Sequence, residues 1–317
     1  MSFRIQGTGI CVPQKILTND DLAAIVDTSD EWIRQRVGIA QRHVCTTESA
    51  ADLAVGAAEA ALADAGLTPG ELDLILSATV SGDNVSPSIA CMVQNRIGAR
   101  CPAYEINAAC AAFLFLLETA AGYFARGKAK NILIIGAERL SGITDYTDRG
   151  TCVIFGDGAG AAVLSEGDNY LDSVQHVTGG DDVLLIPRSA GASPFYQRET
   201  PAPFIRMKGQ DTFRYAVSSI TSDVNELLER NGLCTDDVAF VVPHQANIRI
   251  IEFASRKLKI PMEKFVVNID RYGNTSSASI PIALHELAKS GKLHRGDKII
   301  LTAFGAGLAS AACLITW

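Results

Sequence analysis

The sequence predicts an α/β protein built from two copies of one unit of about 160 residues. Apolar, strand-like segments alternate with longer helical segments, which is typical of parallel or mixed sheets covered by helices. The chain also resembles itself at a nearly constant offset. Residues 66–76 match 232–242 at an offset of 166, residues 107–113 match 274–280 at 167, and the strands starting at Ile132 and Ile299 are also 167 apart. We therefore divide the chain into an N-terminal half, residues 1–168, and a C-terminal half, residues 169–317.

Composition limits the class of protein. The 317 residues are 48% hydrophobic and 20% charged, with a net charge of −7, which argues against general nucleic-acid binding. The eight cysteines are scattered through apolar segments without zinc-like spacing, so we expect free thiols in a reducing compartment and no metal. No apolar run reaches the length of a membrane span, and the N-terminus lacks the features of a signal peptide. We expect a soluble cytoplasmic protein without a membrane partner.

The first elements are expected as a strand at residues 3–12, a short helix capped by Asn19, and a helical segment at residues 28–39. In that segment Trp32 and Arg36 are four positions apart and share a face. Such a pair can hold a nucleotide base by stacking and cation–π contact. A half-buried tryptophan beside a solvated arginine is the alternative.

An Ala-rich helix at residues 49–65, a strand at 72–79 and a helix ending at Ile97 lead to the segment that organises the chain. Residues 103–124 are predicted as a strand, a tight turn and an apolar helix, with Cys110 at the helix start. The positive end of the helix dipole favours a thiolate there, and a thiolate is a nucleophile. The alternative is an inert, packed cysteine.

A strand at residues 131–136 and a Gly-rich run at residues 156–160 close the N-terminal half. The run lacks the lysine of a phosphate-binding loop. A close backbone crossing between strands is the simpler interpretation of its glycines.

In the C-terminal half, polar residues follow apolar strands. The strand at residues 238–242 precedes His244 and a helix at 248–258. The strand at 265–268 precedes Asn274 and a helix at 277–290, and the strand at 299–302 precedes the turn at 305–307. Ligand sites in α/β sheets lie at the carboxyl ends of strands. Alone, His244 could be structural and Asn274 a helix cap, but their equivalent positions in a duplicated fold favour one site shared with Cys110.

Four segments resemble the signatures of the β-ketoacyl-[acyl-carrier-protein] synthase III family, the condensing enzymes that start type II fatty-acid synthesis: residues 107–113, 242–249, 272–281 and 304–307. Further matching segments at residues 30–33, 147–151 and 155–161 extend the resemblance over nearly the whole chain. The resemblance implies a thiolase-like, five-layered αβαβα fold made of two duplicated halves, and a homodimer.

The resemblance also implies a set of site residues. A catalytic triad would be Cys110, His244 and Asn274, with the backbone N–H groups of Cys110 and Ala306 as the oxyanion hole. The coenzyme A cleft would use Thr28, Trp32, Arg36 and Arg149. Acyl carrier protein would bind at Gln245, Ala246, Asn247, Ile248 and Arg249, with Arg214, Arg256 and Lys257 nearby.

Two positions depart from the family pattern. Ser86 stands where relatives often have an aromatic residue that closes the acyl pocket across the dimer, so a wider pocket is expected. Ala306 stands where many relatives have a third glycine, but its backbone N–H is retained.

The implied reaction is a decarboxylative Claisen condensation of a short acyl-CoA, acetyl-CoA by expectation, with malonyl-carrier protein through acyl-Cys110. Coenzyme A enters as a thioester substrate, and no cofactor is expected. Three alternatives stay open. They are a thiolase using Cys313 as a second cysteine, a relative that primes a polyketide or quinolone pathway, and a non-catalytic scaffold that binds carrier protein.

Overall fold

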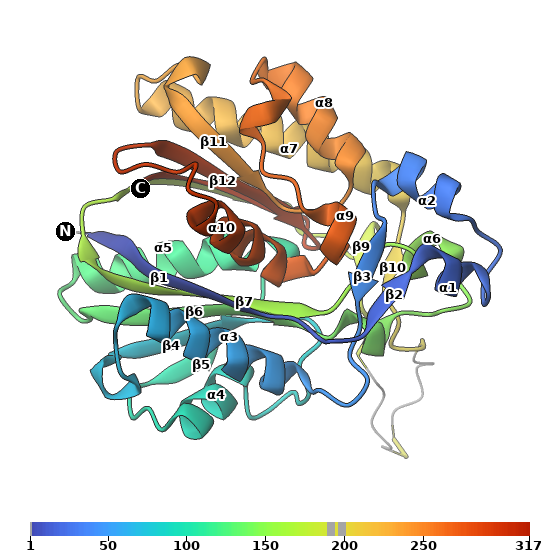
Figure 1. The fold of residues 1–317 in the computed structure, drawn as a ribbon, viewed down its shortest axis with the longest axis horizontal. Coiled ribbons are helices and arrows are strands. Elements are labelled where there is room, and N and C mark those ends of the chain that lie inside the picture. Colours follow the sequence, from blue (N-terminus) through green and yellow to red (C-terminus); the bar gives the residue numbers. More distant parts are fainter. Residues whose placement is uncertain (1, 189–193, 196–200) are drawn as a thin grey trace.

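Two mixed β-sheets form the framework of the computed structural model, which describes residues 2–188, 194–195 and 201–317 (Figure 1). The first sheet has the order β1 (Ser2–Cys11), β7 (Gly158–Gly167), β6 (Asn131–Glu138), β4 (Leu74–Ala78) and β5 (Ala103–Glu105). The second has the order β11 (Val238–Pro243), β12 (Lys298–Gly305), β13 (Ala309–Thr316) and β8 (Tyr170–Val177). Parallel pairing joins β5, β4 and β6, and also β11 and β12, so the carboxyl ends of these strands lie together.

Helices make three further layers. Between the sheets lie α5 (Ala112–Ala125) and α10 (Ser279–Lys289), whose buried side chains share one core with residues of both sheets. The outer face of the first sheet is covered by α3 (Ala50–Ala65) and α4 (Ile89–Ile97). The outer face of the second is covered by α7 (Gly209–Arg230) and α8 (Ile248–Leu258). The five-layered αβαβα fold implied by the family resemblance is confirmed. The apolar character of α5 on every side follows from its place in the middle layer.

The internal repeat also appears in the element positions. The strands β6 and β12 are each eight residues long and begin 167 positions apart. The same offset separates the 3₁₀ turns Ala109–Ala111 and Ser276–Ala278, and the starts of α5 and α10. Strands of the first sheet come from residues 2–167 and strands of the second from residues 170–316. The division at residue 168 stays a prediction.

Short elements gather at the carboxyl ends of the parallel strands, on the right of Figure 1. They are β2 (Ile16–Thr18), α1 (Asn19–Ala23), α2 (Asp30–Val37), β3 (Gln41–His43), α6 (Arg149–Cys152), β9 (Leu184–Leu185), β10 (Arg206–Met207) and α9 (Ile269–Tyr272). The predicted N-cap Asn19 is wrong, because Thr18 caps α1 through a reciprocal bond with Asp21. Asn19 is buried and bonds to Asp30, Ile39 and Arg42 instead.

The predicted strand at residues 265–268 is also wrong. Phe265 makes a single bridge to Val241 rather than a ladder. The glycines at residues 156–160 do allow a close approach, but to a helix and not between strands: a Cβ on Gly156 would lie 2.3 Å from the carbonyl oxygen of Tyr272, the last residue of α9. None of the helices in the described part of the chain combines the length and apolar character needed to cross a membrane.

Candidate active site

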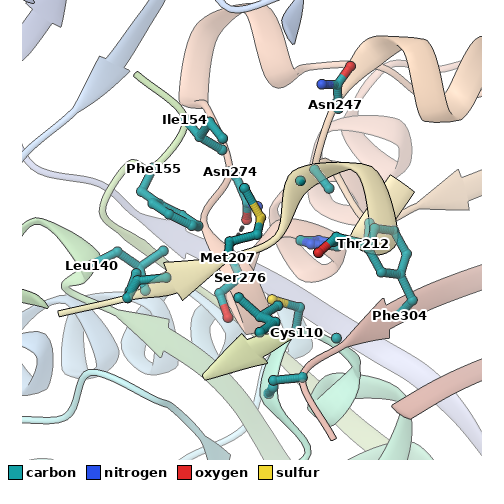
Figure 2. A pocket seen from close by; sticks show the side chains of 18 of the residues that line it. Cys110, Leu140, Ile154, Phe155, Met207, Thr212, Asn247, Asn274, Ser276 and Phe304 are labelled. Carbon is teal, nitrogen blue, oxygen red and sulfur yellow. Dashed lines mark hydrogen bonds between the residues drawn. The ribbon is translucent and has the colours of Figure 1, made fainter. Parts of the chain in front are cut away.

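A cavity of about 250 Å³ opens at the carboxyl ends of the parallel strands, between the two halves of the chain (Figure 2). Cys110, His244, Asn274 and Ala306 all line it, so the structure brings together residues that are far apart in sequence. The rest of the lining is mainly apolar and comes from both halves: Val80, Leu140, Ile154, Phe155, Ile205, Met207, Phe213 and Phe304.

Cys110 lies in the turn that precedes α5. Ala109, directly before it, has a φ of 49°, in the left-handed region. The thiol faces the cavity, yet its surroundings raise its pKa to about 12. Burial is the main cause and the charge of Glu138 adds to it, while hydrogen bonding with Ser276 acts in the opposite direction. The expected thiolate is therefore wrong for this structure, because desolvation outweighs the favourable helix N-terminus.

The backbone around Cys110 is packed against the turn after β12. A Cβ on Gly305 would lie 2.7 Å from the backbone nitrogen of Cys110, so glycine is required for this close approach. Ala306 lines the cavity beside it. The predicted oxyanion donors, the N–H groups of Cys110 and Ala306, thus belong to two backbone segments in contact at the cavity wall.

His244 is held as a neutral imidazole. Its side chain is 1% exposed, and burial lowers its pKa to about 3. The Nδ1 atom lies 2.6 Å from Oγ of Ser279, and that oxygen is also 3.5 Å from the backbone nitrogen of Gln245, which can only donate. The hydroxyl can accept from this N–H and still donate to Nδ1; we assign that arrangement, which places the imidazole proton on Nε2. His244 is then a hydrogen-bond donor through Nε2, as the implied mechanism requires.

Asn274 is also oriented by a hydrogen bond to a neighbouring serine. Its Oδ1 accepts from the backbone N–H of Ser276 at 2.8 Å, which leaves Nδ2 as the donor. Its backbone is fixed by bonds to Ile154 and Gly156. Two side-chain donors, from His244 and Asn274, thus line one cavity with Cys110.

Two of the four residues predicted for the coenzyme A cleft line the cavity, and a third contacts one of them. Trp32 and Arg36, both on α2, line the cavity. The cation over the Trp32 ring is Arg149, whose guanidinium carbon lies 5.1 Å from the ring centroid; Arg36 is not the stacking partner. Arg149 also donates to the backbone carbonyl of Asp27. Thr28 is half-buried, and its Oγ1 is a buried atom without a hydrogen-bond partner.

The residues predicted to bind carrier protein separate into two groups. Gln245 does not belong to an exposed surface: it is 1% exposed and its side chain bonds to the backbone of Pro243, Val266, Asn268 and Ile269. Ala246 and Asn247 line the cavity, and Ile248 is half-buried against Gly38.

Exposed basic side chains make up the second group. Arg249 and Arg214 line a groove together with Arg36, directly beside the cavity mouth. Arg256 and Lys257 are exposed and lie over the ring of Phe253. We call Arg36, Arg214, Arg249, Arg256 and Lys257 the basic rim.

Comparison with known proteins agrees with this geometry. Residues 104–181 match the model of the 3-oxoacyl-[acyl-carrier-protein] synthase III family, and residues 228–317 match that of its C-terminal domain. The chain is 45% identical to a β-ketoacyl-[acyl-carrier-protein] synthase III of Clostridium acetobutylicum, over 100% of this chain and 99% of that one. The chain belongs to the β-ketoacyl-[acyl-carrier-protein] synthase III family.

Solved structures lead to the same family. The crystal structure of the Aquifex aeolicus 3-oxoacyl-[acyl-carrier-protein] synthase III has a TM-score of 0.92 and 44% identity, covering 99% of this chain and 100% of that one. A priming β-ketosynthase from the R1128 polyketide biosynthetic pathway has the same TM-score at 31% identity, covering 99% and 96%.

Two predicted positions lie outside the cavity of this family member. Cys313 is fully buried in β13 beside Tyr170 and does not line the cavity, so it is not placed to act as a second active-site cysteine. Ser86 is exposed and also does not line the cavity of its own chain. Its reach into the pocket of a second subunit stays a prediction.

Three residues at or near the site were not singled out from the sequence. Ser279 fixes the imidazole, Ser276 fixes Asn274, and Glu138 is a buried carboxylate at the end of β6. The repeat pairs Ser276 with Ala109, which could have marked it as a neighbour of Cys110. Glu138 could have been noticed as a charge directly after an apolar strand.

Proposed function

We propose that this member of the family condenses a short acyl-CoA with malonyl-carrier protein, giving β-ketoacyl-carrier protein, coenzyme A and CO2 at the start of fatty-acid synthesis. Acetyl-CoA is the expected acyl donor. The observation that carries the proposal is the convergence of Cys110, His244 and Asn274 on one apolar cavity, with both side-chain donors oriented by serine residues.

The first half-reaction acylates Cys110. Its sulfur attacks the thioester carbon of the acyl-CoA, and the N–H groups of Cys110 and Ala306 stabilise the tetrahedral oxyanion. One such donor typically lowers the barrier by roughly 3 kcal/mol. Coenzyme A leaves with a proton, and the acyl group stays on the sulfur. A nucleotide base held between Trp32 and Arg149 requires Arg149 to move outward, because its guanidinium carbon now lies 5.1 Å from the ring centroid.

The second half-reaction uses the other two side chains. His244 Nε2–H and Asn274 Nδ2–H donate to the thioester oxygen of malonyl-carrier protein and stabilise the enolate as CO2 leaves. Loss of CO2 supplies the carbanion, so no strong base is needed. The carbanion forms a bond to the acyl carbon of acyl-Cys110, and the bond from that carbon to sulfur breaks. Cys110 leaves as a thiolate and takes up one proton from water to restore the thiol.

The partners follow from this chemistry. Because the chain is net acidic, an acidic carrier protein needs a local basic surface, and the basic rim provides one beside the cavity. We include in the proposal a homodimer in the cytoplasm, with neither nucleic acid nor membrane as partner. Coenzyme A thioester serves as substrate, without a metal or further cofactor.

The test is the intact mass of the protein after mixing with a panel of acyl-CoAs, beside Cys110→Ala. We expect a single acyl adduct that is absent from the variant. Absence of any adduct in the unchanged protein would refute the proposal and favour the non-catalytic scaffold.

A second candidate function is priming of a specialised polyketide pathway, which the similarity to the R1128 priming β-ketosynthase favours. The same panel separates the two. A preference for acetyl-CoA supports fatty-acid initiation, whereas a preference for longer or branched acyl groups supports the specialised role.

A further inference from the structure

Glu138, at the end of β6, is a fully buried carboxylate that forms no ion pair within the described part of the chain. Its side chain is 0% exposed, and none of the ion pairs among the described residues includes it. The carboxylate accepts from hydroxyl and backbone donors only: Thr79 Oγ1 at 3.1 Å, Val80 N at 3.0 Å, Ser81 Oγ, Ser277 Oγ at 2.7 Å and Ser277 N at 3.4 Å. A carboxylate buried in this way holds a proton more readily than one in water, and burial raises the pKa of Glu138.

Ser276 lies between this carboxylate and the nucleophile. It is 1% exposed and lines the cavity with Cys110, near which Figure 2 shows it. Its Oγ has no hydrogen-bond partner among the described residues, and the turn Ser276–Ala278 that carries it packs against β6 and against the turn Ala109–Ala111. The turn that carries it has a φ of 48° and is held by Oδ1 of Asn274. A buried hydroxyl without a fixed partner is free to rotate between a donor on one side and an acceptor on the other.

The nucleophile needs such an acceptor. The Cys110 thiol must lose a proton when its sulfur attacks, and its pKa is raised to about 12. His244, the obvious base, is unsuited, because burial lowers its pKa to about 3 and its Nδ1 is occupied by Ser279. Glu138 is the buried carboxylate whose charge acts on the thiol.

We propose that Ser276 and Glu138 form a relay that removes the Cys110 proton during acylation. The thiol proton moves to Oγ of Ser276 while the serine hydroxyl proton moves to Glu138. The sulfur forms its bond to the acyl carbon, and the bond from that carbon to the coenzyme A sulfur breaks. The departing thiolate takes up one proton, which Glu138 returns through Ser276. No net proton is gained or lost, and no other reactant is needed.

The inference rests on the proposed acylation of Cys110, so the experiment measures that step alone. The rate of acyl-adduct formation with acetyl-CoA is recorded by intact mass from pH 5 to 10. For the unchanged protein we expect a rate that falls at low pH, as Glu138 becomes protonated, and is independent of pH above that. Glu138→Gln and Ser276→Ala should be slowed by about 100-fold or more at pH 7. Both rates should then rise tenfold per pH unit, because free thiolate becomes the nucleophile.

Asp157→Asn is the matched control, because Asp157 is also a fully buried carboxylate bonded to a serine hydroxyl and backbone N–H groups. Its profile should keep the shape of the unchanged protein. Should Glu138→Gln fail to fold, Ser276→Ala decides the matter. Variant profiles that stay independent of pH overturn the relay while leaving the proposed function intact. An unchanged protein that forms no adduct overturns both.

Discussion

Burial sets the charge states of Cys110 and His244 at the cavity. It raises the pKa of Cys110 to about 12 and lowers that of His244 to about 3, so both groups are neutral near pH 7. A neutral imidazole suits a hydrogen-bond donor to an enolate and excludes an imidazolium–thiolate pair. The chemistry assigned to His244 therefore belongs to the second half-reaction and leaves the first unaffected.

This division of labour can be tested with His244→Ala. We expect acylation of Cys110 to be retained within a few-fold, while decarboxylation of malonyl-carrier protein falls by about 100-fold or more, because an oxyanion donor is lost. Adduct formation and CO2 release are measured separately. An equal loss in both half-reactions would contradict the assignment.

The backbone at Gly305 leaves no room for a side chain beside the nucleophile. In Gly305→Ala the new Cβ would meet the Cys110 nitrogen at 2.7 Å, so the turn carrying the nucleophile must shift. We expect acylation to slow by about 10² to 10³, the typical effect of losing one oxyanion donor.

Gly122→Ala, in α5, is the control for Gly305→Ala, because a Cβ there meets no atom within 4 Å. It should acylate at the normal rate in the same intact-mass assay. A normal rate in Gly305→Ala would remove the close backbone approach from the mechanism.

At the scale of elements, the repeated turn before α5 and α10 explains why the two halves meet in one site. Ala109 and Ser276, 167 positions apart, both have a φ near 50° although neither is glycine. In one half this turn presents Cys110, and in the other it follows Asn274. The repeat was readable from the sequence, so the meeting of Cys110, His244 and Asn274 could be predicted. The serine partners could not, because nothing in the local pattern shows which hydroxyl faces which ring nitrogen.

Arg249, on α8, belongs to the basic rim, and substituting it tests whether the rim binds carrier protein. Arg249→Glu should raise the KM for malonyl-carrier protein roughly tenfold at low salt, with a smaller effect at high salt, and leave acyl-CoA kinetics unchanged. Arg249 is exposed in the groove beside the cavity, so the change should alter docking and not the fold.

Arg295→Glu serves as the control for Arg249→Glu. It makes the same charge change before β12, at the opposite end of that strand from the cavity. Its KM for malonyl-carrier protein should stay unchanged. An equal rise in both variants would show that net charge matters and the rim does not.

For the whole molecule, the sequence pattern predicted sheets covered by helices and the strand ends that carry the site, whereas the order of the five layers was implied by the family resemblance. The predictions that were wrong depend on burial. Gln245 was expected on a surface, but it is buried and its side chain bonds to four backbone groups. Cys110 was expected as a thiolate, but desolvation raises the pKa of its thiol. The local sequence pattern indicates which face of a helix or strand is apolar. The desolvation of a side chain depends instead on atoms that both halves of the folded chain contribute. Trp32 illustrates the same limit, since its stacking partner Arg149 comes from a helix more than 100 residues away.

We expect the free energy of unfolding to depend on the ionisation of Asp223, a buried carboxyl group that does not take part in the proposed reaction. Asp223, on α7, is 1% exposed; its Oδ1 lies 3.7 Å from His176, and its Oδ2 is without a hydrogen-bond partner. Burial raises its pKa from 3.8 to about 6, against smaller opposing effects of Ser310 and His176. Between these values the folded state binds more protons than the unfolded state. This carboxyl therefore lowers stability progressively as pH rises from about 4 to above 6.

The substitution Asp223→Asn should remove the pH dependence of stability that the ionisation of this carboxyl group causes. We expect the variant to be more stable than the unchanged protein at pH 8, by about 1 to 3 kcal/mol, and to lose this advantage near pH 4. Melting temperatures of both proteins are compared across that range. Asp211→Asn, on the same helix but with a side chain 45% exposed, is the control for loss of an acidic side chain and should not be more stable than the unchanged protein at pH 8. A gain for Asp223→Asn that is the same at pH 4 and pH 8 would mean that packing, and not ionisation, is what the substitution relieves.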